Sequence, residues 1–289
     1  MNSISISKNK FDNLKKLDTC GIVNTEGELY EFYYRRQRKV LKKLYFQDGT
    51  IFANKLYTLE MLNSNKLPSN FIKPDYLVSV SNKIVGFTVP YVEGIILANY
   101  LTREDIDIKL QIESLKKVGL IIKDMVNIRK YTNLKEFYLN DIHEANFIVT
   151  ANDICVIDLD SSKVSPNFNF QARYLSSRGL LKEFKEKYNV TDYSNGAYVS
   201  SSLNSDLYCY IIMILNYLYG SNVNNMELSD FYNYINYLKF VGFDEGLLSC
   251  FKRIASYKEN KNPLDYLDSI NRNQLYRAKE NVYRKVISR

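Results

Sequence analysis

The spacing of hydrophobic residues changes character near residue 93. Before it, apolar and polar residues alternate in short runs, which is the pattern of β-strands. The runs with this alternation are residues 29–34, 39–45, 76–80 and 84–89. One segment among them, residues 51–62, has the spacing of an α-helix instead. The first part of the chain is therefore predicted to be small and rich in strands.

The rest of the chain mostly follows helical spacing. Apolar residues recur three and four positions apart between Leu110 and Ile128, which predicts an amphipathic helix. Residues 207–219 are apolar on almost every side, which predicts a buried central helix. The fold class is thus predicted to be α+β, with a strand-rich part at residues 1–92 and a larger helical part at residues 93–289.

A short hairpin is predicted inside the helical part. Its strands are two apolar runs, residues 147–149 and 154–157, with a polar turn between them. Asn146 and Asp158 flank the hairpin, so its outer ends would make them neighbours although they lie twelve residues apart. Their oxygens are ligands that Mg²⁺ prefers, and Asp141, on the entering loop, is expected to face the same place. The alternative is a surface hairpin with ordinary polar ends.

The composition is that of a soluble globular protein, since 46% of the 289 residues are hydrophobic and 25% are charged. No apolar stretch approaches the length of about 18 residues that spans a membrane. The first eight residues lack the apolar block of a signal peptide, so we expect a cytoplasmic protein without a membrane span. Wide spacing predicts reduced thiols rather than disulfides for the four cysteines, Cys20, Cys155, Cys209 and Cys250.

The net charge of +7 is spread along the chain, so we expect no specific nucleic-acid partner. The last nineteen residues are more basic than the rest, with six basic residues and one acidic residue. Such a tail can contact an acidic partner, or it can be the solvated face of a terminal helix. The second interpretation is favoured.

The loop from Asp141 to Asn146, followed by a strand that leads to Asp158, resembles the catalytic loop and metal-binding segment of the protein-kinase-like phosphotransferases. The resemblance implies a bilobal fold, with an N-lobe at residues 1–92 and a C-lobe at residues 93–289. It also implies phosphoryl transfer from ATP with Mg²⁺. Asp141 would orient and deprotonate the acceptor hydroxyl, while Asn146 and Asp158 would hold the metal.

Weaker matches occur upstream in the order of that family. Gly21 and Gly27 resemble a glycine-rich phosphate-covering hairpin, whose alternative interpretation is a plain turn. Lys42 resembles the strand lysine that braces the α- and β-phosphates, although the neighbouring Lys43 leaves the assignment open by one position. Glu60, on the predicted helix, would be the partner of Lys42; the alternative is an ordinary surface glutamate.

Two further segments resemble parts of the family. Residues 89–94 resemble the hinge between lobes, where the carbonyl of Pro90 and the N–H of Val92 would bind adenine, with Val89 beside the pocket. Asp206 resembles the helix aspartate that accepts hydrogen bonds from the catalytic-loop backbone. Its alternative role is an N-cap of the helix that follows.

The pattern also departs from protein kinases. Asn140 replaces the arginine before the catalytic aspartate, so we expect activity that does not depend on phosphorylation of the activation segment. His143, the single histidine, makes the loop more similar to aminoglycoside and choline phosphotransferases. We interpret it as a hydrogen-bonded loop residue, because Asp141 already fills the acid–base role.

Three function classes remain. A protein Ser/Thr kinase is favoured, with a protein substrate as acceptor. A small-molecule kinase acting on a small hydroxylated compound is the first alternative, and an inactive pseudokinase scaffold is the second. Catalysis is favoured over the scaffold because the five residues that chemistry would need are all intact, namely Lys42, Glu60, Asp141, Asn146 and Asp158.

Overall fold

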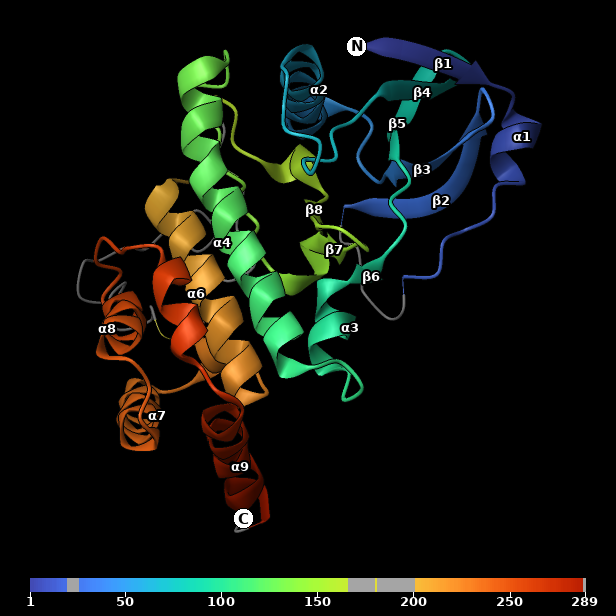
Figure 1. The fold of residues 1–289 in the computed structure, drawn as a ribbon. Helices are drawn as coiled ribbons and strands as arrows, with labels where there is room; N and C mark the ends of the chain where they lie inside the picture. Colours follow the sequence, from blue (N-terminus) through green and yellow to red (C-terminus); the bar gives the residue numbers. More distant parts are fainter. Residues whose placement is uncertain (20–25, 166–179, 181–200, 288–289) are drawn as a thin grey trace. The chain divides into compact units, whose positions relative to one another are not determined.

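The computed structural model describes residues 1–19, 26–165, 180 and 201–287, and it is a mixed α+β structure with a strand-rich sheet and a helical part (Figure 1). The chain divides into two compact units, each made of three chain segments. Unit 1 comprises Met1–Ile95, Ile128–Phe137 and Phe147–Phe168. Unit 2 comprises Ile96–Asn127, Tyr138–Asn146 and Asn169–Arg289.

Unit 1 contains a five-stranded sheet in the order β1-β4-β5-β3-β2. The strands are β1 (Asn2–Ile6), β2 (Gly27–Tyr34), β3 (Gln37–Leu44), β4 (Tyr76–Val80) and β5 (Lys83–Pro90), and the helices of the same unit are α1 (Lys8–Asp12) and α2 (Gly49–Ser64). β1 and β4 are parallel, and the other neighbours are antiparallel. The four strands and the helix predicted from the hydrophobic spacing are confirmed. β1 was not predicted.

Two hydrophobic clusters stabilise this sheet. One contains Ile4 and Ile6 of β1 together with Leu41 of β3 and other buried residues. The other joins Leu59 of α2 to the sheet residues Leu44 and Phe87. Lys42 pairs with Phe87 across β3 and β5, so both side chains lie on the face that packs against α2.

The predicted hairpin is present as β7 (Phe147–Val149) and β8 (Ile154–Val156), which pair antiparallel. With β6 (Ile95–Ile96) they form a three-stranded sheet, and the 3-10 helix η2 (Leu159–Ser161) follows. Val156 donates to Asn70 O at 2.8 Å and accepts from Ile72 N at 3.0 Å. Because these bonds join the hairpin to the first ninety-five residues, it belongs to unit 1, whereas we had expected it in the part from residue 93 onward.

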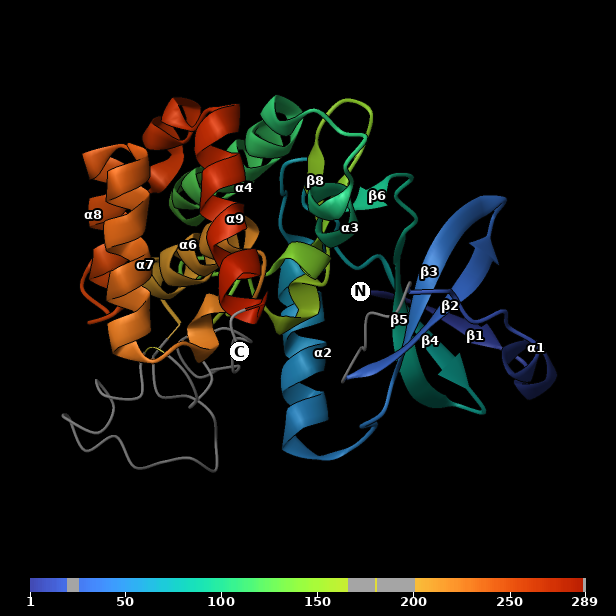
Figure 2. The same cartoon turned by 90° about the horizontal axis from the view of Figure 1, so that it is seen from below.

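Unit 2 is helical, and the longest helix, α4, continues for one turn into unit 1. The helices are α3 (Leu97–Thr102), α4 (Ile108–Tyr131), η1 (Glu144–Asn146), α6 (Leu203–Tyr219), η4 (Val223–Asn225), α7 (Leu228–Val241), α8 (Glu245–Ile254), η5 (Pro263–Ser269) and α9 (Arg272–Ile287). α6 packs against α8 and α9, and Figure 2 shows these helices from a second side. In the ranges that the structure describes, no helix combines the length and the apolar character needed to cross a membrane.

The predicted central helix is confirmed as α6, whose residues from Ser205 to Leu215 are all buried. Two of its tyrosines donate hydrogen bonds within unit 2: Tyr210 to Leu115 O at 2.7 Å and Tyr217 to Gln111 Oε1 at 2.6 Å. These bonds matter because a buried hydroxyl without a partner costs about 1–3 kcal/mol. The N-cap is Ser202, whose side chain accepts from Ser205 N in a capping box.

The structure also bears on the predictions for the cysteines and for the basic tail. Among the described residues, Cys155, Cys209 and Cys250 form no disulfide, in agreement with the predicted reduced thiols, and Cys20 lies outside these residues. The basic tail begins as α9, which supports the interpretation as a terminal helix.

Candidate functional site

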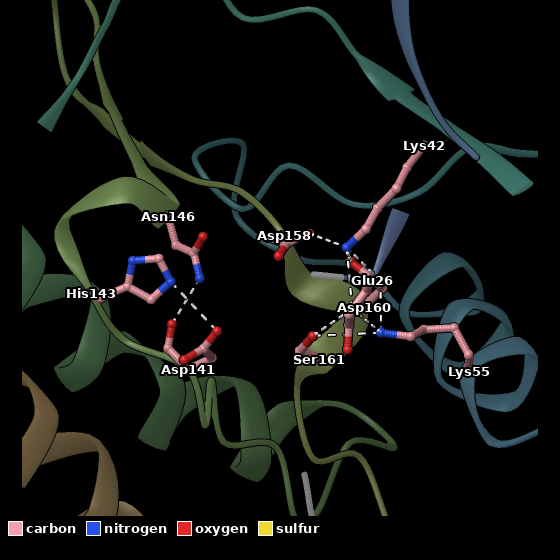
Figure 3. A network of polar contacts seen from close by, with 9 residues as sticks. All are labelled: Glu26, Lys42, Lys55, Asp141, His143, Asn146, Asp158, Asp160 and Ser161. Atoms are coloured by element: carbon pink, nitrogen blue, oxygen red, sulfur yellow. Dashed lines mark hydrogen bonds and ion pairs between the residues drawn. The ribbon is translucent and has the colours of Figure 1, made fainter. Parts of the chain in front are cut away.

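Lys42 and Asp158 meet in unit 1, although 116 positions separate them in the sequence. Lys42 Nζ donates to Asp158 Oδ1 at 2.6 Å (Figure 3). Lys42 is only 3% exposed, so it is not a surface lysine. Lys43 is more exposed and pairs with Glu28 at 3.3 Å, which makes Lys42 the lysine of the site. The side chain of Asp158 retains 27% exposure.

Three more charged side chains surround this pair. Asp160 of η2 lies 3.0 Å from Lys42 Nζ and 2.8 Å from the ammonium of Lys55, which α2 supplies. Glu26 lies 3.3 Å from Lys42 and 2.7 Å from Lys55. We call these five residues, Glu26, Lys42, Lys55, Asp158 and Asp160, the lysine–carboxylate cluster.

The cluster carries one more negative than positive charge when every member is ionised. Burial alone would lower the pKa of Lys42, but the carboxylates, Asp158 foremost, outweigh it and raise that pKa well above its usual value. Burial also favours neutral Asp160, yet its two lysine neighbours hold its pKa below the usual value. Burial raises the pKa of Asp158 to about 6, with a further contribution from neighbouring Asp160. Of the two aspartates, Asp158 therefore carries the less stabilised negative charge.

The backbone of Asp158 is also unusual. Its φ of 59° and ψ of 36° lie in the left-handed region, which residues other than glycine adopt uncommonly, although asparagine and aspartate do so more often than most. Such a conformation costs free energy and persists where neighbouring structure imposes it, commonly at functional sites. Here β8 precedes Asp158 and η2 begins after it, so the turn between the two elements imposes the conformation.

The predicted pair between Lys42 and Glu60 is wrong. Glu60, at 57% side-chain exposure, pairs with the amino group of Met1. The reason is the rotation of α2: Lys55, Leu59 and Leu62 form its buried face, so Glu60 points away from the site. Lys42 takes carboxylate partners from Glu26, Asp158 and Asp160 instead.

Of the two predicted nucleotide-covering glycines, Gly27 belongs to the described residues. Gly21 lies outside the described residues. Gly27 begins β2 opposite Leu44, and a Cβ there would collide with the backbone carbonyl of Lys43. Close pairing of β2 and β3 is therefore sufficient to explain Gly27.

The predicted hinge residues lie at the end of β5. Pro90 is the last residue of this strand and is exposed, while Val92 is partly buried. Farther along, a Cβ on Gly94 would collide with the carbonyl of Val149 in β7. This close approach joins the segment after β5 to the hairpin within unit 1, the unit that also holds Lys42 and Asp158.

Asp141, His143 and Asn146 form a second group, in unit 2 (Figure 3). Ala145 N donates to His143 Nδ1 at 3.2 Å, so the proton of a neutral imidazole lies on Nε2. That nitrogen is 3.4 Å from Asp141 Oδ2. Asn146 Nδ2 donates to Asp141 O at 2.8 Å, which directs the amide oxygen away from this carbonyl.

Asp206 holds the start of this loop. Its carboxylate is fully buried and accepts from Leu139 N at 3.0 Å and from Asn140 N at 2.8 Å. Two backbone donors compensate the loss of water around the buried carboxylate. Because Ser202 caps α6, Asp206 is not its N-cap. Asn140, at φ 68°, accepts from Ser201 Oγ at 2.6 Å through its amide oxygen.

Sequence reasoning missed Glu26, Lys55 and Asp160. Lys55 had a recognisable signal, since it shares the apolar face of its helix with Leu59 and Leu62 at helical spacing. A charged residue on such a face needs a buried partner. Asp160 is the second aspartate after β8 in the sequence. Glu26 had no signal, because its contacts come from three separate segments.

The carboxylate of Asp158 is of the donor type that Mg²⁺ takes. Among the described residues, no group of three or more His, Cys, Asp or Glu side chains could hold a metal by itself. Mg²⁺ commonly takes one or two protein carboxylates and completes its shell with phosphates and water. Within unit 1, Asp158 provides such a carboxylate.

The comparisons with known proteins found no protein family whose model matches this sequence and no curated protein that matches it.

Proposed function

We propose that this protein is an ATP- and Mg²⁺-dependent phosphotransferase with a bilobal, protein-kinase-like fold. The observation that carries the proposal is the ion pair at 2.6 Å between Lys42 and Asp158, two residues that the motif order assigned to one nucleotide site. A lysine for phosphates and a carboxylate for the metal are both needed there. The mixed strand-rich and helical structure is compatible with the fold.

The two groups have separate roles in this proposal. In unit 1, Lys42 binds the α- and β-phosphates and Asp158 binds the metal, with Pro90 and Val92 at the adenine. For Asn146, in unit 2, the sequence motif predicts an amide-oxygen contact with the metal. Bound Mg²⁺ would neutralise charge that develops on the transferring phosphoryl group.

Asp141 is the proposed general base of unit 2. The Nε2–H of His143 points toward its Oδ2, so the imidazole orients the carboxylate. Asp206 acts farther back, by holding the backbone of Leu139 and Asn140. The carboxylate would accept the proton of the acceptor hydroxyl as the phosphoryl group transfers.

The acceptor we favour is a protein Ser/Thr hydroxyl, with cytoplasmic localisation. A small-molecule hydroxyl is the second candidate, and one observation favours it: the contact between His143 and Asp141 belongs to the loop pattern D-x-H-x-x-N that resembles aminoglycoside and choline phosphotransferases. Assays with model proteins, aminoglycosides and amino alcohols distinguish the two.

Calorimetry with ATP tests the proposal. The wild-type protein should bind ATP at millimolar Mg²⁺, and Asp158→Ala should lose the part of the binding that depends on the metal. Lys43→Met is the matched control. Lys43 follows Lys42 on β3, but it pairs with Glu28 and lies outside the cluster. If the wild type bound no ATP, the protein would be a scaffold rather than an enzyme.

A further inference from the structure

We infer that Asp160, held by Lys55, is the residue that positions Lys42 for phosphate binding. This inference rests on the proposed function and assigns the positioning residue of the same site. Asp160 would thus fill the role that the sequence had suggested for Glu60.

The contacts of Asp160 suit it to fix the position of an ammonium. Its two oxygens lie 3.2 and 3.0 Å from Lys42 Nζ, and the side chain is 1% exposed. Asp158 contacts the same nitrogen through one oxygen and is 27% exposed. Asp158 can therefore turn to a cation while Asp160 keeps Lys42 in place.

Lys55 holds Asp160 through Oδ2, the oxygen that also lies 3.0 Å from Lys42 Nζ. Lys55 Nζ lies 2.8 Å from Asp160 Oδ2 and 2.7 Å from Glu26 Oε2 (Figure 3). The lysine is buried on the face of α2 that carries Leu59 and Leu62. α2 therefore contributes Lys55 to the site, and Asp160 links Lys55 to Lys42. Glu60 of the same helix takes no part.

The charges of the cluster fall into two groups, four residues that balance one another and Asp158. Lys42 and Lys55 balance Asp160 and Glu26, so these four residues together are neutral. Asp158 supplies the remaining negative charge, and it is the carboxylate assigned to the metal. The structure thus separates positioning of the lysine from binding of the cation.

Nuclear magnetic resonance of the lysine side chains tests the positioning without a nucleotide. In protein labelled with ¹⁵N-lysine, the Lys42 ammonium should exchange slowly with water and give a signal, which Lys42→Arg identifies. Glu60→Gln should keep this signal and Asp160→Asn should lose it. A signal that persists in Asp160→Asn would overturn the inference.

Steady-state kinetics test the functional consequence. Because a misplacement of about 1 Å can cost roughly a hundredfold in rate, kcat/KM for ATP should fall about a hundredfold in Asp160→Asn. Glu60→Gln should change it by less than about fivefold, as its exposed ion pair contributes little. Equal values for the two variants would contradict the inference.

A double variant separates positioning from stability. Removing one partner of a buried ion pair destabilises a protein, whereas removing both charges together costs much less. Lys55→Met with Asp160→Leu should therefore unfold near the wild-type temperature and still show the low kcat/KM. Recovery of full activity would mean that Asp160 serves stability alone. If the wild type bound no ATP, the proposed function would fail, while the lysine signal would still decide whether Asp160 fixes Lys42.

Discussion

At the scale of single residues, Asp141 is the general base of the proposed function, and we expect it to contribute to turnover but not to ATP binding. His143 Nε2 lies 3.4 Å from its carboxylate, and Asp141 belongs to unit 2, whereas the lysine–carboxylate cluster belongs to unit 1. We expect Asp141→Asn to lower kcat by about a hundredfold or more, since general-base catalysis contributes about 10²–10⁴ in rate. The dissociation constant of ATP, measured by calorimetry, should remain nearly unchanged.

Asp230→Asn is the control for this variant, because Asp230 is an exposed residue of α7 in the same unit. Its kcat should equal that of the wild type. A parallel loss of turnover and ATP affinity in Asp141→Asn would show that Asp141 has a structural role instead.

Glu28 on β2 predicts a dependence of stability on pH. Hydrogen bonds from Lys16, at 2.8 Å, and from Tyr30 and Lys43 lower the pKa of this carboxylate from 4.5 to about 2. A lowered carboxylate pKa stabilises the folded state above the unfolded pKa, and this stabilisation disappears as the pH falls through the folded pKa. It should therefore be complete above pH 4.5 and lost by about pH 2.

The measurement compares Glu28→Gln with the wild type by urea unfolding across this pH range. The variant should have a lower free energy of unfolding at pH 7, by less than about 1 kcal/mol because the ion pairs lie near the surface. The difference should vanish toward pH 2. A difference that stays constant from pH 7 to pH 2 would contradict the assigned role of Glu28.

At the scale of elements, α4 and α6 meet closely at Gly119. A Cβ on Gly119 would lie 2.7 Å from Tyr210 Oη and 3.2 Å from Asn262 Oδ1. Alanine in place of glycine favours a helix by about 1 kcal/mol, but overpacking costs about 1–3 kcal/mol. Because Tyr210 is buried and bonded to Leu115, it cannot move away easily, so Gly119→Ala should reduce the free energy of unfolding by about 1 kcal/mol.

A double-mutant cycle with Tyr210→Phe checks this prediction. The phenylalanine removes the hydroxyl that the new methyl group would meet, so the double variant should lose less stability than the sum of the two single variants. Strict additivity of the two losses would mean that the tyrosine hydroxyl does not restrict this position.

At the scale of the whole molecule, Asn140 predicts how activity is regulated. The amide oxygen of Asn140 accepts from Ser201, and its backbone N–H donates to Asp206. Both groups therefore already have hydrogen-bond partners in unit 2. A neutral amide also cannot give a phosphate the bidentate, charged contact of arginine. We therefore expect phosphatase treatment to leave the turnover nearly unchanged, measured with labelled ATP before and after complete dephosphorylation.

Mass spectrometry confirms that dephosphorylation is complete in this experiment. A large fall in turnover would overturn the regulatory prediction. Efficient phosphorylation of an aminoglycoside or amino alcohol, with none of any protein tested, would assign the protein to the small-molecule branch.

The sequence by itself determined the strands β2 to β5, the hairpin and the helices α2, α4 and α6. Their periodicity is local, since each element buries one face or is buried all round. β1 escaped prediction because two isoleucines, Ile4 and Ile6, are too few to distinguish a strand from an irregular terminus. Their burial became evident only from pairing with β4.

The tertiary structure alone decided the partners of Lys42. The order of motifs in the sequence predicted that Asp158 lies near Lys42. Whether Lys42 also pairs with Asp160 and Glu26 or with Glu60 depends on the rotation of α2 about its axis. Helical spacing in the sequence indicates the buried face of α2, but only the packing of Leu59 against Leu44 and Phe87 shows which carboxylates that face meets. Ion pairs between distant segments form after packing has brought the segments together, so they are read from the structure and not from the sequence.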